Sequence, residues 1–230
     1  MYDMIYEIPN SIKSTLETVR KSRLEFDLPG PLVFTGNGTA SYSSLMGSQV
    51  LNLTKTKWRA VQAFELANYE KGSGDVTVGV SHSGITKSIL DALSKAKSKG
   101  AHVAALTHFH DRPISRVADK SLVIGSGPDK SMCHKKTYAA PAAAVMELSP
   151  RMTEALGSEL ESVRKQFDSD LLSKLEFSID STESQARLAF DVLGNASKIF
   201  FAAAGPNLVT AREPHSRSRN LAICRQREWS

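Results

Sequence analysis

A short apolar strand that runs into a hydroxyl-rich turn constrains the fold of this sequence more than any other feature. Val76 to Val80 are mostly β-branched and apolar, which is typical of a strand buried on both faces. The next six residues, Ser81-His-Ser-Gly-Ile-Thr86, contain three hydroxyl groups. Apolar residues then recur at helical spacing as far as Gly100, so the pattern predicts a strand, a turn and a helix in that order.

The turn between this strand and this helix has the properties of an anion-binding site. The first backbone N–H groups of a helix lack partners within the helix, the helix dipole favours negative charge, and serine and threonine hydroxyls add donors. No acidic residue lies between Ser81 and Ser88 to repel a phosphate. A helix start that is merely capped by serine and threonine is the competing interpretation, and the pattern alone does not separate the two.

A second strand, turn and helix of the same kind come earlier in the chain. Residues 32–35 form a short apolar strand, residues 36–41 (Gly-Asn-Gly-Thr-Ala-Ser) form the turn, and a helix is expected over residues 42–53. The glycines let the backbone approach a ligand, and Thr39 and Ser41 add hydroxyls. Ser41 stands where a dinucleotide fingerprint needs its third glycine, and the Walker pattern is absent from the chain, so no nucleotide cofactor is expected.

Strands and helices alternate along the first 150 residues. Further strands are predicted at residues 58–63, 101–107 and 121–124, and further helices at residues 8–25, 64–70, 113–117 and 137–148. Such alternation predicts an α/β fold with a parallel sheet and helices on both faces. Ligands of such sheets bind beyond the carboxyl ends of the strands, so the two turns should lie close together at one edge.

The pattern changes after Pro150. An amphipathic helix is predicted over residues 152–167, and Thr182-Glu-Ser-Gln185 resembles a capping box that opens a second helix ending at Gly194. Residues 198–204 then predict a strand that leads into Gly205, as though a second copy of the unit were beginning. We therefore expect a first domain over residues 1–150, a helical connection over 151–194, and the start of a second domain with an irregular basic tail over 195–230.

Composition and charge exclude several classes of protein. The net charge is +5, but residues 212–230 hold five arginines against two glutamates, so the remaining 211 residues carry only +2. The basic character is therefore confined to a tail, and no nucleic-acid partner is expected. No apolar run approaches the roughly 20 residues of a membrane span, the N-terminus lacks a signal-peptide layout, and Cys133 and Cys224 form no metal-binding spacing. We expect a cytoplasmic protein without a membrane partner, a metal or another cofactor.

An ordered set of motifs supports a family resemblance. Gly38-Thr-Ala-Ser41, Val80-Ser-His-Ser-Gly-Ile-Thr86, Ala118-Asp119 and the segment from Gly127 to Tyr138 occur in the order and spacing of sugar isomerase (SIS) domains. The sequence resembles in particular the isomerase half of glutamine–fructose-6-phosphate aminotransferase. The resemblance covers about residues 30–148, and residues 195–213 resemble the opening of a second SIS copy. It implies a three-layer αβα sandwich with a parallel, flavodoxin-like sheet.

The resemblance also implies a sugar-phosphate site. By that match, the Ser-x-Ser-Gly-x-Thr turn binds the phosphate and the earlier glycine-rich turn contacts the sugar. The residues expected in the site are Gly38, Thr39, Ser41, Ser81, His82, Ser83, Thr86 and Lys136. His82 stands where the family often has glutamine, and Ile85 replaces the family's usual acidic residue.

Two functions remain open at this point. One is aldose–ketose isomerisation of a hexose or aminohexose phosphate, in which a carboxylate or histidine base shifts a proton between C1 and C2 without a metal. The family's catalytic glutamate would lie a few residues past Glu213, where this sequence diverges, so no catalytic residue is assigned. The other function is a non-catalytic module that senses a sugar phosphate. A homodimer is expected in either case, because SIS sites are often completed by a neighbouring subunit.

Two further groups of residues have both a functional and a structural interpretation. His108 and His110, with Asp111, could form a metal pair, but without a third ligand a pair of loop histidines is the better explanation. Cys133 has no visible base to activate it as a nucleophile, which favours a partly buried structural cysteine.

Overall fold

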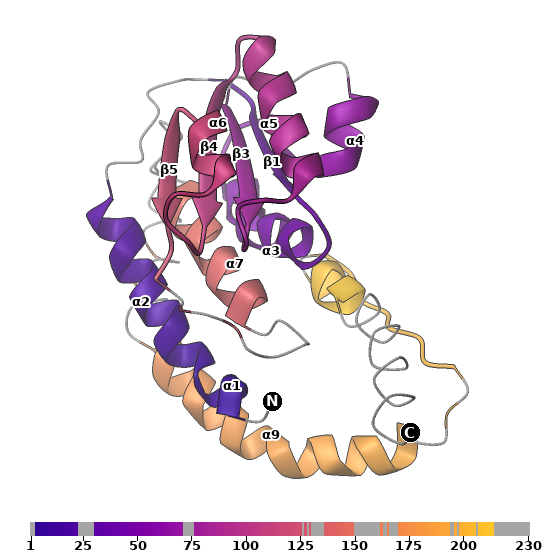
Figure 1. Cartoon of the computed structure of the whole chain (residues 1–230). Coiled ribbons are helices and arrows are strands. Elements are labelled where there is room, and N and C mark those ends of the chain that lie inside the picture. The colour runs from indigo at the N-terminus through magenta and orange to yellow at the C-terminus, as the bar shows by residue number, and fades with distance from the viewer. Residues whose placement is uncertain are drawn as a thin grey trace, which may run out of the picture.

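The computed structural model describes residues 3–22, 30–70, 76–125, 127, 129, 136–149, 162, 165, 170–193, 196, 198–205 and 207–213. Its centre is a five-stranded sheet in the order β2-β1-β3-β4-β5 (Figure 1). The strands are β1 (Leu32–Gly36), β2 (Trp58–Gln62), β3 (Val76–Ser81), β4 (His102–Thr107) and β5 (Lys120–Val123). All four neighbouring pairs are parallel, which confirms the predicted sheet.

Helices cover both faces of the sheet, which confirms the three-layer sandwich. One face is covered by α2 (Ile8–Lys21), α3 (Thr39–Ser48) with the short 3-10 helix Gln49–Leu53, and α7 (Lys136–Leu148). The other face is covered by α4 (Ala63–Asn68), α5 (Lys87–Ser98) and α6 (Pro113–Val117). A four-residue helix, α1 (Asp3–Tyr6), precedes α2.

Alternation along the central strands divides the core into two halves. In β3 and β4, Val78 and Leu106 contribute to the core against α2 and α7, whereas Val103 and Ala105 face α5 and α6. All six residues of β3 are buried, because this strand lies in the middle of the sheet and both of its faces are covered. A strand buried in this way holds the turn that follows it in a fixed position.

The chain beyond the sandwich differs from the prediction. One helix, α9 (Leu171–Leu193), runs through the expected helix start at Thr182. The capping-box prediction is wrong because the backbone is already helical there, and the Thr182 hydroxyl donates to the Ser178 carbonyl one turn earlier, at 2.5 Å. The helix predicted over residues 152–167 lies outside the described residues, apart from Ser162 and Lys165, which are helical.

The strand predicted over residues 198–204 is also wrong. These residues have no regular secondary structure and are exposed, and residues 207–213 after them are helical. A β-strand satisfies its backbone groups by pairing with a neighbouring strand, and no described strand pairs with this segment. The basic tail over residues 214–230 lies outside the described part of the chain.

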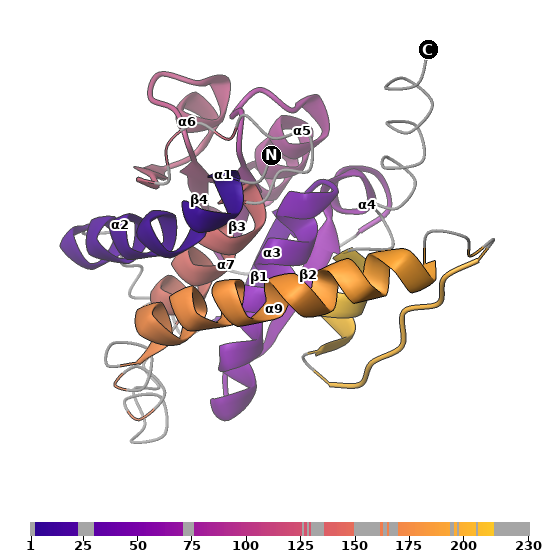
Figure 2. The same cartoon turned by 90° about the horizontal axis from the view of Figure 1, so that it is seen from below.

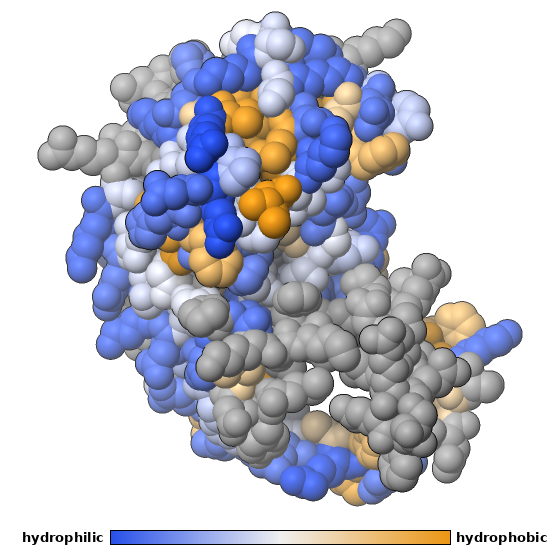
Figure 3. Space-filling view, in the orientation of Figure 1, coloured by the Kyte–Doolittle hydropathy of each residue, from blue (hydrophilic) through white to orange (hydrophobic). Residues whose placement is uncertain are grey.

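Helix α9 extends away from the sandwich, on the side where the carboxyl ends of the strands lie (Figures 1 and 2). Its first turns pack through Leu171 and Leu175 against a small cluster made by α2 and α7. Farther along the chain, large apolar side chains are exposed, and hydrophobic residues show along α9 and the segment after it in Figure 3. In the described part of the chain, no helix combines the length and the apolar character that crossing a membrane requires.

The two-sided core predicts how single substitutions act. Leu106 is fully buried in the centre of the sheet, whereas Leu53 is 47% exposed at the end of the 3-10 helix. Leu106→Ala should lower the free energy of unfolding by about 2–5 kcal/mol, because it leaves a cavity. Leu53→Ala should change that free energy by no more than about 0.5 kcal/mol. Urea unfolding of both variants checks this, and equal effects would contradict the described core.

Candidate functional site

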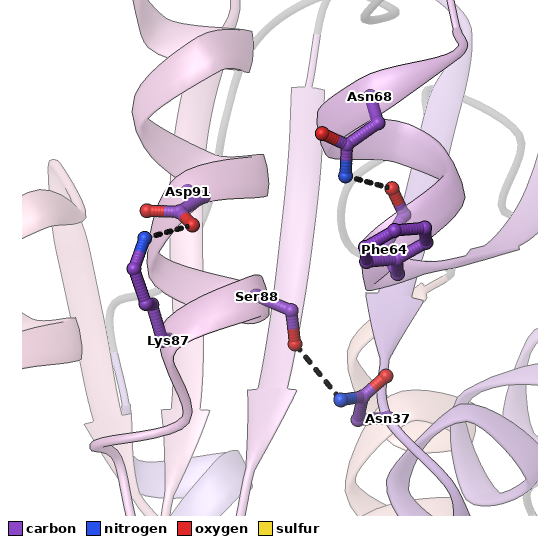
Figure 4. A network of polar contacts seen from close by, with 6 residues as sticks. All are labelled: Asn37, Phe64, Asn68, Lys87, Ser88 and Asp91. Carbon is purple, nitrogen blue, oxygen red and sulfur yellow. Dashed lines mark hydrogen bonds and ion pairs between the residues drawn. The ribbon is translucent and has the colours of Figure 1, made fainter.

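The two predicted turns lie side by side at the carboxyl edge of the sheet. Because β1 pairs directly with β3, the residues after each strand emerge next to one another. The Asn37 side chain, in the turn after β1, donates a hydrogen bond from Nδ2 to the Ser88 Oγ in the first turn of α5, at 2.8 Å (Figure 4). The predicted closeness of the two turns is therefore confirmed.

The turn after β3 is held by its own serines and by a glycine. Ser81 Oγ accepts the Gly84 N–H at 3.1 Å, and Ser83 Oγ accepts the Ile85 N–H at 3.4 Å. Gly84 has φ +68°, and a Cβ added there would lie 2.5 Å from the Cβ of Arg112. Only glycine fits this conformation without strain and without collision. Ser81 is 2% exposed, so its hydroxyl stabilises the turn from inside the protein. Ser83 is half-buried, so a ligand can reach it.

Thr86 bears on both interpretations of this turn. It is the N-cap residue of α5, yet its side chain makes no capping hydrogen bond. The first turn of α5 holds no acidic residue, and the only charged side chain there, Lys87, pairs with Asp91 at 2.6 Å (Figure 4). The start of α5 thus carries no side-chain cap from Thr86 and no competing negative charge, as an anion-binding site requires. Anion binding by this turn stays a prediction.

The turn after β1 presents an open backbone. Gly38 has φ +52° and ψ −124°, a conformation essentially restricted to glycine, and no atom lies within 4 Å of the place where a side chain would be. Because Ala40 and Ser41 already donate backbone hydrogen bonds to Asn37 and Gly38, helix α3 begins at Thr39, three residues earlier than predicted. The N-termini of α3 and α5 therefore lie at the same edge of the sheet.

A pair of histidines whose rings are in contact lies at the next position along this edge. The register pairs Ser81 with Thr107, so the residues that follow, His82 and His108, emerge side by side. Their ring centroids are 4.4 Å apart with the planes tilted by 45°, and the His108 N–H donates to the His82 carbonyl at 3.3 Å. Sequence reasoning missed this pair, although parallel strands that end at the same register were a sufficient signal.

The metal-pair interpretation of His108 and His110 does not fit the geometry. His108 is buried and His110 is exposed, so the two side chains lie in different environments. Within the residues that the structure describes, no group of three or more potential metal ligands occurs. Cys133 lies outside these residues.

His108 is held in its neutral form. Burial, the charge of His82 and, least of all, the charge of Lys136 lower the pKa of His108 to about 3, although Asp129 acts in the opposite direction. The side chain is 9% exposed, and among the described residues neither ring nitrogen has a hydrogen-bond partner. His108 therefore contributes a neutral, flat ring to the site around pH 7.

Lys136 is buried beside this pair. The first residue of α7, it is 4% exposed, and its Nζ lies 2.5 Å from the Glu7 Oε2. The backbone N–H of Thr137 is bound by the Asp129 Oδ2 at 3.2 Å, which satisfies one of the first donors of the helix. Sequence reasoning did not find Glu7 or Asp129. The Glu7 carboxylate offsets the charge of Lys136, so contact between Lys136 and a ligand stays a prediction.

A pocket of about 420 Å³ lies next to the turn after β1. It is lined by Tyr42, Gln62, Phe201, Leu208, Ala211 and Arg212. Tyr42 directly follows the expected site residue Ser41, and Gln62 is the last residue of β2, so the pocket belongs to the same edge of the sheet. Its volume suits a small organic molecule. Glu213, beside Arg212, is 7% exposed.

The low pKa of His108 predicts how stability depends on pH. The unfolded chain takes up a proton at this histidine near pH 6.5, whereas the folded chain does so only near pH 3. The unfolded state therefore binds more protons between these values, and the free energy of unfolding falls as the pH drops through this range. His108→Phe removes this contribution, so between pH 7 and pH 4 the variant should lose about 2–3 kcal/mol less than the unmodified chain. Urea unfolding at several pH values checks this, and parallel pH profiles would contradict it.

Comparisons with known proteins agree with this geometry. The SIS domain family profile matches residues 31–148. Glutamine–fructose-6-phosphate aminotransferase (isomerizing) of Sulfolobus acidocaldarius is 24% identical over 229 residues, which cover 96% of this chain and 38% of that protein. An uncharacterized HTH-type transcriptional regulator of Caldanaerobacter subterraneus is 32% identical over 92 residues, which cover 39% of this chain and 32% of the regulator.

A solved structure shows the same fold. Tagatose-6-phosphate ketose/aldose isomerase of Escherichia coli superposes with a TM-score of 0.69 at 14% identity, over 92% of this chain and 60% of that one. The chain spans well under half the length of the two curated relatives, the aminotransferase and the regulator. The family profile covers 118 of the 230 residues, including both turns and all five strands. The chain therefore belongs to the SIS domain family.

Proposed function

We propose that this protein binds a sugar phosphate at the carboxyl edge of its sheet, with the turn from Ser81 to Thr86 as the phosphate site. The observation that carries this proposal is the free start of α5, where Thr86 makes no side-chain cap and no acidic residue is present. Membership of the SIS domain family supports it, as do the sugar-phosphate names of the relatives.

Each of the two turns binds a different part of such a ligand. Ser83, Thr86 and the first N–H groups of α5 donate to the phosphate, since a serine Oγ that accepts an N–H can still donate its own proton. Ser81 holds the turn, and His82 stands beside it. On the other side, the open backbone at Gly38 and the hydroxyls of Thr39 and Ser41 contact the sugar, with Lys136 as a further expected contact.

The chemistry proposed for a complete site is aldose–ketose isomerisation of a hexose or aminohexose phosphate. A base would move a proton between C1 and C2 after the ring has opened. By the resemblance this base would lie just past Glu213, where this sequence diverges, so no residue of the chain is assigned as the base. The pocket beside Tyr42 and Gln62 lies on the sugar side of the phosphate turn, and its volume leaves room for the carbon chain of the substrate.

A non-catalytic sensing module is the second candidate. The likeness to an HTH-type transcriptional regulator over 92 residues favours it, because that protein is named as a regulator and not as an enzyme. Both candidates use the same phosphate site and differ in whether a base is present. A coupled assay for isomerisation of fructose 6-phosphate and glucosamine 6-phosphate separates them: turnover supports the enzyme, and binding without turnover supports the module.

We further propose that the protein is a cytoplasmic homodimer. Its two cysteines lie far apart in the sequence, which suits a reducing compartment. The exposed apolar side chains along α9, such as Phe177 at 73% and Phe190 at 62%, suit burial by a second subunit. Light scattering should give a mass near 50 kDa, about twice the 25.0 kDa of the chain. A mass of one chain at micromolar concentration would contradict the dimer.

Substitutions in the phosphate turn should separate a binding site from a helix cap. Ser83→Ala should weaken fructose 6-phosphate binding about tenfold or more, because a charge-assisted hydrogen bond contributes roughly 1.5–3 kcal/mol. Thr86→Glu should abolish binding, because a carboxylate would occupy the place of the anion. Isothermal titration measures both effects, and unphosphorylated fructose should bind poorly to every variant.

Ser98→Ala is the matched control for this experiment. Ser98 is the last residue of the same helix, and its hydroxyl donates to the Lys95 carbonyl far from the proposed site. This variant should bind fructose 6-phosphate as the unmodified chain does. If Ser83→Ala and Ser98→Ala both leave the affinity unchanged, the turn caps the helix and does not bind phosphate.

A further inference from the structure

The histidine pair at the edge of the phosphate turn has a role that the phosphate site alone does not explain. His82 belongs to the turn itself, and His108 follows the neighbouring strand β4 at the same register. The two ring centroids lie 4.4 Å apart with the planes tilted by 45°. His108 is buried, and His82 is half-buried with its Nε2 inside the protein. The contact places the His108 ring against the His82 ring.

His82 is confined from two sides by this arrangement. The His108 ring lies 4.4 Å from the His82 ring at a tilt of 45°, and the Phe109 ring lies 5.4 Å away in a T-shaped contact with the planes at 84°. Phe109 is in turn covered by the Arg112 guanidinium, 5.0 Å from its centroid. The backbone of His82 is fixed as well, because its carbonyl accepts hydrogen bonds from the His108 N–H and the Thr107 hydroxyl. Few orientations remain open to the His82 side chain.

The charged groups around His82 and His108 permit a proton to be added to His82 while His108 stays neutral. Because burial keeps His108 neutral, it does not compete with His82 for a proton near pH 7. Of the other charged groups around His108, Lys136 is paired with Glu7 at 2.5 Å, and Asp129 binds the N–H of Thr137. The Arg112 guanidinium lies over the Phe109 ring, while the Arg112 Cβ lies against Gly84 in the turn. A phosphate dianion in the neighbouring turn favours the charged form of an imidazole within about 4–6 Å.

We propose that His108 is a positioning residue that holds the His82 ring at the phosphate turn, so that His82 takes up a proton from solvent when a phosphate monoester dianion binds. This inference rests on the proposed function, because it concerns the same site. The imidazolium formed on His82 then donates a charge-assisted hydrogen bond to the phosphate. His108 acts through the shape and the neutrality of its ring, and it does not touch the ligand.

Isothermal titration of the full chain with fructose 6-phosphate at pH 7.5 tests this proposal. Titrations in buffers of different ionisation enthalpy give the number of protons taken up on binding. A phosphate monoester titrates near pH 6, so the ligand is mostly a dianion at pH 7.5. The unmodified chain should take up ~0.5–1 proton per ligand.

Four variants separate positioning from a merely structural role. His82→Gln should reduce proton uptake to nearly zero while binding persists with lower affinity. His108→Ala should lower the affinity about tenfold and reduce the uptake by at least half, because a charge-assisted contact that is not held in place is weaker. His108→Phe supplies a flat neutral ring and should restore both quantities. His110→Gln changes an exposed histidine two residues away and should behave as the unmodified chain does.

The outcomes distinguish this inference from the proposed function. If the unmodified chain does not bind fructose 6-phosphate at millimolar concentration, the proposed function fails, and this inference fails with it. If it binds without proton uptake, or if His82→Gln keeps the uptake, this inference alone is overturned. The same holds if His108→Ala matches the unmodified chain. Should His108→Ala fail to fold, His108→Leu fills the space without a flat ring, and it should show the same loss of uptake.

Discussion

The parallel pairing of β3 with β1 on one side and β4 on the other is the constraint on which the rest of the structure depends. It brings three chain segments to one edge in fixed register: the turn after β1, the turn after β3 and the histidine after β4. Since β3 is buried along its whole length, the turn that follows it cannot shift without disturbing the core. The site is therefore as rigid as the sheet that carries it.

The close packing behind the turn after β3 follows from this constraint. Gly84 has no room for a side chain because Arg112 lies against it, and the Gly84 carbonyl accepts the Ile114 N–H at 3.0 Å. This contact joins the turn to α6, while Asn37 and Ser88 join it to the turn after β1. Anion-binding donors that are already oriented lose little entropy when a ligand arrives. Such preorganisation is what a phosphate site needs.

Much of this arrangement could be predicted from the sequence, because local pattern determines it. Buried strands rich in valine, hydroxyls between a strand and a helix, and glycine at Gly38 all act within a few residues. The five predicted strands of the sheet are confirmed, as is the closeness of the two turns. The ring contact between His82 and His108 and the pairing of Lys136 with Glu7 depend on contacts between distant segments, so local pattern did not contain them. Only the register of a parallel sheet could have suggested the contact between His82 and His108.

The predictions failed where local pattern had no tertiary partner to support it. Thr182 has the sequence of a helix cap but lies inside α9, because the residues before it also favour helix. Residues 198–204 have the composition of a buried strand, yet no described strand lies beside them, and Phe200 is 88% exposed. Propensity alone does not make a strand when its backbone groups have no ladder to join.

The most direct test of the account is an amide NMR titration with fructose 6-phosphate. If the phosphate binds at the carboxyl edge between β1 and β3, the largest shifts should occur at the amides of residues 83–88, with smaller shifts at residues 37–41. Equal concentrations of fructose should produce neither. Shifts that lie elsewhere, or shifts that fructose reproduces without its phosphate, would contradict the assignment of the turn after β3 as the phosphate site.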